Sequence, residues 1–161
     1  MLFRSWPAGI QSPGRSWDKL VGQIDVLSTV AEMIGAEVPD DGAEDSQSFY
    51  SVLIDPKSDA KRLPLINHGI SGRFSITEGK WKLIMPHKNL KHELYNLEKD
   101  PGEETNVYGK NVKLATRLEQ RISEIVCRGR TTDGVPQLND TGYWDDLAWL
   151  NEGQYNRLAP K

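Results

Sequence analysis

Three kinds of residue in this chain have side chains that could carry catalysis or bind a metal: one cysteine, three histidines and several clustered acids. The single cysteine, Cys127, excludes a disulfide framework and a four-thiolate zinc site within the chain, because both need more than one thiol. His87 and His92 flank the sequence KNLK at 88–91. Five residues of separation in a loop is no recognised metal-ligand spacing, so we interpret this segment as a solvated basic loop.

The acidic residues form no recognisable metal-binding pattern. Asp100, Glu103 and Glu104 lack the alternating oxygen ligands and the invariant glycine of an EF-hand loop, which favours a solvated turn. The pairs at 40–41 and 145–146, both Asp-Asp, lie in acidic, turn-rich segments with nothing basic arranged around them. We therefore predict no metal site in this chain.

Composition and charge exclude several further classes of protein. The 161 residues carry a formal net charge of −3, with a pI near 5.6 and a mean hydropathy of −0.58. No global basic field attracts nucleic acid or anionic lipid, and the basic residues of one predicted helix are too sparse for nucleic-acid binding. No apolar run approaches the roughly 20 residues of a membrane span, and the N-terminus lacks the apolar core of a secretory signal. The basic residues in question are Lys113, Arg117, Arg121, Arg128 and Arg130.

The elements that would position any site centre on a predicted hairpin. Alternating residues run from Phe74 to Ile76 and from Trp81 to Leu83. If residues 78–79 form the two-residue loop, Ile76 falls opposite Trp81 and Phe74 opposite Leu83, with all four side chains on one face. A lone hairpin is too weak to be stable, so this face needs further strands and a covering helix.

The neighbouring segments supply those elements. Residues 63–69 predict a strand that leads into the hairpin, and residues 93–97 predict a strand that stops at the turn signal 99–102. A helix capped by Asn111 follows, with Leu114, Leu118, Ile122 and Ile125 on one stripe. The predicted fold class is therefore α+β: a small antiparallel four-stranded sheet covered by a C-terminal helix.

An earlier helix is predicted to have an apolar stripe without an evident partner. Asp25 is a suitable N-cap and Gly35 a suitable stop. A stripe of this kind, when exposed, predicts a sticky surface or an oligomer interface. Its members are Leu27, Val30, Ala31 and Ile34.

Two motifs in the sheet region resemble one enzyme family. Residues 74–84 read F-x-I-x-x-G-x-W-K-L-I, and residues 93–106 read E-L-Y-N-L-E-x-D-P-x-E-x-x-N. This order is similar to the C-terminal subdomain of type I sulfatases of the arylsulfatase A kind, in the alkaline phosphatase superfamily. The similarity runs from Trp6-Pro7-Ala8-Gly9-Ile10 to about residue 140, and Leu2-Phe3 resembles the end of a strand of the large α/β domain.

The resemblance implies a division of the chain into three regions. Residues 1–55 would be a remnant of the α/β catalytic domain, which in the family packs the stripe-bearing helix on its central sheet. Residues 63–130 would be the sheet-plus-helix subdomain, and residues 131–161 an extension packed on the body. The chain would thus begin in the middle of a larger fold.

The resemblance also implies a chemistry whose centre this chain lacks. Sulfatases use a formylglycine made within a Cys/Ser-x-Pro-x-Arg motif, and a calcium that polarises the sulfate. Cys127 is followed by Arg-Gly-Arg, and at Ser12-Pro13-Gly14-Arg15 the proline and arginine come one place too early. We expect calcium and formylglycine only in the full-length enzyme and no catalytic residue here.

One histidine is the candidate for a functional role by resemblance. In the family, a histidine at the position of His68 often lines the outer substrate pocket. Asn67, Ser71 and Arg73 would surround that mouth and bind a sugar hydroxyl or a second anionic group, a task suited to arginine's planar fork. The alternative is a strand-end histidine whose ring bonds only backbone. The expected partner of the full-length enzyme is a sulfated small molecule or sugar.

Two other functions remain open at this point. The chain could be a non-catalytic binding or interaction module derived from a sulfatase, or the C-terminal part of a related phosphoester or phosphonate hydrolase. Relatives are often periplasmic, secreted or lysosomal, but the compartment is not predicted by this sequence.

Overall fold

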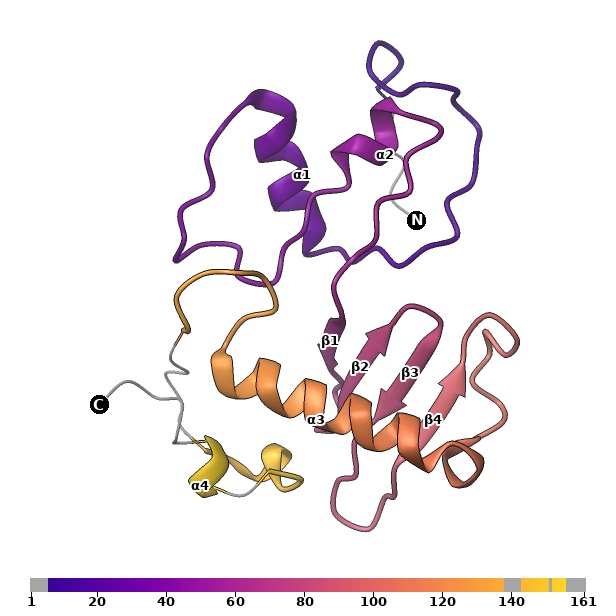
Figure 1. Cartoon of the computed structure of the whole chain (residues 1–161), viewed down its shortest axis with the longest axis vertical. Helices are drawn as coiled ribbons and strands as arrows, with labels where there is room; N and C mark the ends of the chain where they lie inside the picture. Colours follow the sequence, from indigo (N-terminus) through magenta and orange to yellow (C-terminus); the bar gives the residue numbers. More distant parts are fainter. Residues whose placement is uncertain (1–5, 138–142, 151, 156–161) are drawn as a thin grey trace. The chain divides into compact units, whose positions relative to one another are not determined.

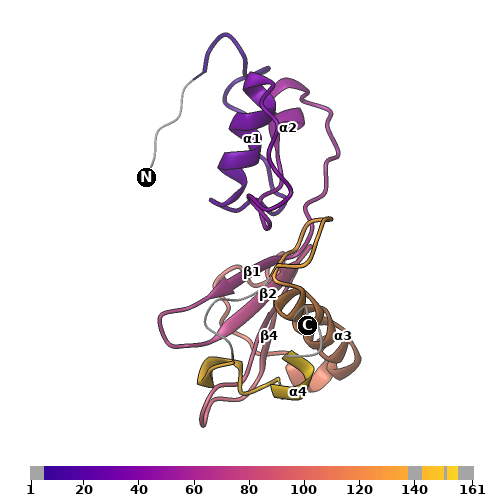
Figure 2. The same ribbon diagram turned by 90° about the vertical axis from the view of Figure 1, so that its left-hand side faces the viewer.

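The computed structural model describes residues 6–137, 143–150 and 152–155, which form two compact units, Met1–Arg62 and Leu63–Lys161. Figures 1 and 2 show the helical character of the first unit and the sheet and long helix of the second. The strand end predicted at Leu2-Phe3 lies outside the described residues.

The first unit contains two helices, α1 (Asp25–Ile34) and α2 (Tyr50–Ile54). Helix α1 ends as predicted at Gly35, whose φ of 69° is the left-handed conformation that glycine adopts readily. The expected N-cap was wrong: the cap position is Ile24, and Asp25 is the first helical residue with a buried side chain. The carboxylate is drawn inward because Arg62 and two backbone amides bond it there.

The face that α1 buries is polar, which is unusual for a helix of this amphipathic pattern. Asp25 and Thr29 are its buried residues, and the Thr29 hydroxyl accepts a hydrogen bond from the Phe49 amide. The apolar stripe faces outward instead, with Leu27 59% and Ile34 71% exposed. The exposed stripe predicted from the sequence is therefore present.

The second unit is built on a four-stranded antiparallel sheet in which the strands follow one another in chain order. Each strand pairs with the next along the chain, so no connection crosses the sheet (Figure 1). The strands are β1 (Leu65–His68), β2 (Phe74–Glu78), β3 (Trp81–Ile84) and β4 (Glu93–Asn96).

The hairpin register differs from the predicted one by two residues. Glu78 pairs with Trp81 and Ile76 with Leu83, so the loop is 79–80 and not 78–79. Gly79 takes the first loop position with a φ of 57°, which suits two-residue loops that place glycine there. Since side chains alternate with a period of two, a shift of two residues keeps every side chain on its predicted face.

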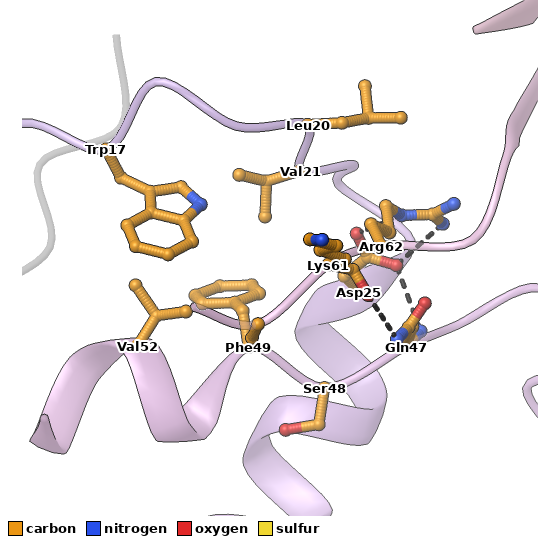
Figure 3. A pocket seen from close by; sticks show the side chains of 11 residues that line it. Trp17, Leu20, Val21, Asp25, Gln47, Ser48, Phe49, Val52, Lys61 and Arg62 are labelled. Atoms are coloured by element: carbon orange, nitrogen blue, oxygen red, sulfur yellow. Dashed lines mark hydrogen bonds and ion pairs between the residues drawn. The ribbon is translucent and has the colours of Figure 1, made fainter. Parts of the chain in front are cut away.

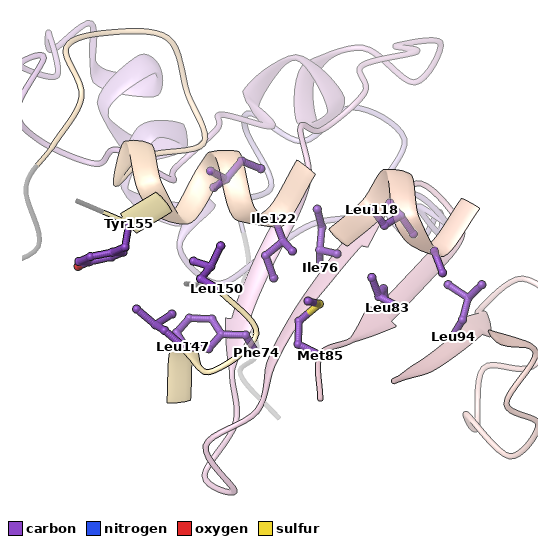
Figure 4. Close-up of a cluster of buried hydrophobic side chains, with 12 residues drawn as sticks. Phe74, Ile76, Leu83, Met85, Leu94, Leu118, Ile122, Leu147, Leu150 and Tyr155 are labelled. Atoms are coloured by element: carbon purple, nitrogen blue, oxygen red, sulfur yellow. The ribbon is translucent and has the colours of Figure 1, made fainter. Parts of the chain in front are cut away.

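Helix α3 (Val112–Arg128) covers one face of this sheet and closes the core (Figure 4). It follows a short 3-10 turn, η1 (Tyr108–Lys110), and ends at Gly129 with a φ of 70°. Asn111 holds the cap position, but its side-chain amide donates to the carbonyl of Val107, so the expected side-chain cap is missing. Fully buried residues from sheet and helix meet here: Ile76, Leu83, Met85, Leu94, Ala115, Leu118 and Ile122.

The end of the described chain returns to the same core. It contains the turn η2 (Asp145–Leu147) and the short helix α4 (Glu152–Tyr155). Leu147, Leu150 and Tyr155 are buried in the core cluster beside Phe74 (Figure 4). The α+β arrangement predicted from the sequence is confirmed, and this segment completes one end of it.

Candidate functional site

The sheet topology brings distant loops together at one end. Strand β1 ends where β2 begins, and β3 ends where β4 begins, because antiparallel neighbours reverse direction. The connections at 69–73 and 85–92 therefore lie at the same end of the sheet. His68, the candidate named from the sequence, is the last residue of β1 at this end.

The His68 ring is held by two side chains. Its Nε2 lies 2.9 Å from Oδ2 of Asp146, and its face stacks on Phe74 with 4.4 Å between ring centroids. The side chain keeps 42% of its surface exposed. The ring is thus bonded by a carboxylate and not, as in the alternative interpretation, by backbone.

Asp146 also faces a second histidine, which corrects the expectation that nothing basic surrounds the pair at 145–146. His87 Nε2 lies 3.7 Å from Oδ1 of Asp146, and the His87 ring is buried. The loop from 87 to 92 is therefore only partly solvated: its lysines are exposed, but His87 turns inward and His92 stacks on Tyr108. Sequence gave no signal for this cluster, because 78 residues separate His68 from Asp146.

The other three predicted site residues do not converge on His68. Asn67 pairs with Ser75 in the sheet, and neighbouring residues of a strand point to opposite faces, so Asn67 lies on the face away from the His68 ring. Ser71 is exposed in the connection between β1 and β2. These positions leave His68 as the central group of the candidate site.

Each nitrogen of the Arg73 guanidinium already donates a hydrogen bond within the chain. Its guanidinium donates to Glu93 Oε1 at 2.6 Å and to the carbonyls of Met85 and Lys91. Burial tends to raise the pKa of Glu93, but hydrogen bonds from Arg73 and Tyr95 outweigh it and the pKa is lowered. The arginine therefore ties the β3–β4 connection to the sheet.

A shallow, basic depression lies on the same connection. Its volume is about 630 Å³, and the exposed Lys88 and Lys91 stand on its wall beside the stacked rings of His92 and Tyr108. His92 Nε2 lies 3.4 Å from a carboxylate oxygen of Glu119. The depression therefore places positive charge on the same loop that carries His87.

The first unit has a smaller pocket of a different kind (Figure 3). Its volume of about 20 Å³ has room for about one water molecule and none for a sugar. Asp25 and Arg62 form an ion pair there, with two contacts of 2.7 Å, and hydrogen bonds from Arg62 and backbone amides outweigh burial to lower the Asp25 pKa. This pair joins the start of α1 to the end of the unit and serves the fold.

The described residues do not fit the calcium and formylglycine of a sulfatase. Across 6–137, 143–150 and 152–155 there is no group of three or more histidines, cysteines or acids that could hold a metal ion. Burial raises the pKa of the Cys127 thiol, and the residues after it do not form the modification motif. No chemical step in this chain is therefore assigned to either group.

Helices long and apolar enough to cross a membrane are also lacking among the residues described.

A family model for the C-terminal region of N-sulphoglucosamine sulphohydrolase matches residues 1–128. The chain belongs to this sulfatase family. The resemblance seen in the two sheet motifs is thereby confirmed, and the chain has the fold of a sulfatase C-terminal part.

Similar proteins of known sequence or structure agree with the family. An N-acetylgalactosamine-6-O-sulfatase of Bacteroides thetaiotaomicron is 26% identical over an alignment of 137 positions, which covers 76% of this chain and 26% of the relative. The chain thus spans about a quarter of the length of that curated relative.

Two solved structures share the fold. A protein of Bacteroides thetaiotaomicron described as a sulfatase is 21% identical with a TM-score of 0.60, covering 80% of this chain and 31% of that one. Ps i-CgsB, crystallised with k-i-k-neocarrahexaose, is also 21% identical with a TM-score of 0.51, covering 83% of this chain and 28% of that one.

Proposed function

We propose that this chain is the C-terminal part of an enzyme that hydrolyses sulfate esters of sugars, and that it supplies structural support and one wall of the substrate pocket. The observation that carries the proposal is the exposed His68 ring at the sheet end where the β1–β2 and β3–β4 connections meet. Calcium and formylglycine would belong to the full-length enzyme.

The three regions named from the sequence fit this proposal. Residues 1–55 would extend the catalytic domain, 63–130 would form the subdomain that carries His68, and 131–161 would pack on it. The exposed stripe of α1 would be covered by the catalytic sheet, since exposed apolar surface of this kind is costly in water.

The substrate class is inferred from chemistry and from the named relatives. His68 offers a ring nitrogen to a sugar hydroxyl or, when protonated, to an anionic group. Ser71, exposed in the β1–β2 connection, would bind a neighbouring hydroxyl from the rim, and the exposed lysines at 88 and 91 add positive charge. A sulfatase of N-acetylgalactosamine 6-sulfate and a carrageenan-type oligosaccharide complex among the similar proteins support a sulfated sugar.

Binding by the chain tests the pocket. We expect weak, saturable binding of N-acetylgalactosamine 6-sulfate by NMR, with shift changes centred on His68 and smaller changes with the unsulfated sugar. His68→Ala should weaken binding about three- to tenfold, the value of one hydrogen bond. Lys80→Ala, in the loop at the opposite end of the sheet, is the control and should bind as wild type. Equal binding by the His68 variant would refute the pocket role.

Turnover tests the assignment of the reaction centre. The purified chain should not hydrolyse an aryl sulfate. Turnover that EDTA abolishes would contradict the proposal, because it would place a metal-dependent centre within these residues.

A non-catalytic sugar-binding module is the second candidate, favoured by a buried core in the second unit whose described members all come from that unit. It predicts tight binding of the sulfated sugar by this chain alone, whereas a pocket wall predicts millimolar affinity. The third possibility, a phosphoester or phosphonate hydrolase, has no observation in its favour beyond superfamily membership.

A further inference from the structure

The His68 ring is engaged by a segment that lies beyond the family match. The match ends at residue 128, and Asp146 comes from the turn η2 near the end of the described chain. This segment is firmly anchored, because Leu147 and Leu150 are buried in the core and the Tyr143 hydroxyl donates to the carbonyl of Leu150 at 2.9 Å.

Aromatic contacts with Phe74 also hold this segment. Trp144 and Trp149 lie 6.2 and 6.1 Å from Phe74 between ring centroids, and Phe74 stacks on His68. Packing on Phe74 therefore sets the positions of the histidine and of the turn that carries Asp146 together.

The backbone opposite Asp146 leaves room for the carboxylate. Gly72 has a φ of 76°, and a Cβ at this position would lie 2.6 Å from Oδ1 of Asp146. A larger residue would push the carboxylate away from His68. The glycine thus permits the close approach that the hydrogen bond requires.

The contact leaves one ring nitrogen of His68 for an outside partner. Nε2 is bonded to Asp146, while Nδ1 has no hydrogen-bond partner among the residues that the structure describes. A carboxylate that accepts from one ring nitrogen holds the proton there and fixes the ring orientation, so the other nitrogen keeps its lone pair.

We infer that Asp146 is a positioning residue for His68: it holds the Nε2 proton and orients Nδ1 to accept a hydrogen bond from a hydroxyl of the sulfated sugar. This inference rests on the proposed pocket role of His68. His87, buried on the other side of the carboxylate, limits its movement.

A competing hypothesis predicts the opposite effect of removing Asp146 on sugar affinity. Asp146 could occupy the position of the sugar's anionic group between the two histidines, and its removal would then strengthen sugar binding. In the structure Asp146, on the core-packed turn η2, bonds Nε2 of His68. The His68 side chain stays 42% exposed, so a sugar can still reach the ring, which favours a positioning role for Asp146.

The test combines a structural and a binding readout on the full chain. With ¹⁵N-labelled histidine, wild type should give an Nε2–H signal of His68 that exchanges slowly with water. Asp146→Ala should lose this signal and bind N-acetylgalactosamine 6-sulfate about three- to tenfold more weakly. Asp146→Asn keeps an oxygen acceptor and should retain the signal and near wild-type affinity.

Asp145→Ala is the matched control, since it removes the same charge from the exposed neighbour. It should behave as wild type. A persistent Nε2–H signal in Asp146→Ala, tighter sugar binding in that variant, or equal losses in the Asn and Ala variants would each overturn the inference.

The outcomes separate this inference from the proposed function. If His68→Ala binds as wild type, the pocket role fails whatever Asp146 does. If His68→Ala weakens binding but Asp146→Ala does not, only the positioning role fails. If Asp146→Ala unfolds the last segment, Gly72→Ala, which pushes the carboxylate away from His68, should lose the signal and the affinity in its place, and wild-type behaviour of that variant would overturn the positioning role.

Discussion

At the residue scale, two carboxylates, Asp25 and Glu93, stabilise the fold in their ionised form. The Asp25 side chain is 1% exposed and pairs with Arg62, whose side chain is 5% exposed. Glu93 is bonded by Arg73 and by the Tyr95 hydroxyl. In both cases hydrogen bonds to the ionised carboxylate outweigh its burial, so each pair adds stability only while the acid is charged.

Asp25→Asn should destabilise the first unit by about 3–5 kcal/mol, because the buried Arg62 loses its carboxylate. Since the folded pKa of Asp25 lies below its usual 3.8, its contribution is complete above that pH and is lost as the pH falls through the folded value. Hydrogen exchange of the α1 amides at neutral and acidic pH measures this loss. Asp18→Asn, at an exposed position, is the control and should change little.

The raised pKa of Tyr95 gives a prediction for alkaline pH. Burial and the hydrogen bond to Glu93 raise its pKa from 10.0 to about 12. Its contribution to stability is therefore complete below pH 10 and is lost as the pH rises through 12. Ultraviolet titration of the phenolate should find Tyr95 ionising near pH 12. Tyr95→Phe should remove that step, and Tyr50→Phe should leave it.

At the scale of elements, helices α1 and α3 both end at a glycine in the left-handed conformation, but the two glycines have different neighbours. Gly35 and Gly129 both adopt left-handed φ values, but a Cβ on Gly35 meets nothing within 4 Å, whereas one on Gly129 would lie 2.2 Å from the carbonyl oxygen of Gln137. The chain that follows α3 thus packs directly on its last turn.

Alanine substitutions at the two glycines should separate strain from contact. Gly35→Ala should cost about 1–2 kcal/mol from backbone conformation alone. Gly129→Ala should cost a further 1–3 kcal/mol, because the backbone of Gln137 must move. Urea unfolding, monitored by hydrogen exchange of the α1 and α3 amides, gives the change in the free energy of unfolding for each variant. Equal costs would mean that the contact with Gln137 is not maintained.

Elements also mark the limit of what the sequence could predict. Alternation set the faces of Ile76 and Leu83 correctly although the register was wrong, because face depends on parity and register depends on the conformation of Gly79. His68 could be named from local motifs. Its partner Asp146 could not, since only the packing of η2 on the core brings the two together.

At the scale of the whole molecule, the outward stripe of α1 exposes large apolar side chains to water. We expect it to cause self-association of this chain in the absence of a covering domain. The double variant Leu27→Lys/Ile34→Lys should lower the association seen by sedimentation at rising concentration, without loss of helicity. Ile70→Lys, at a solitary exposed residue, is the control. Unchanged association in the double variant would mean that the stripe is not the interface.

The chain-order arrangement of the sheet has a kinetic consequence. Every strand pairs with its sequence neighbour, and the connections are short, so little loop entropy is lost before each pairing forms. Domains with such local contacts cross their folding barrier quickly. The second unit should therefore regain its structure within about milliseconds of dilution from denaturant. The bond between His68 and Asp146 of η2, which spans more of the sequence than any other hydrogen bond given for the described residues, should form last.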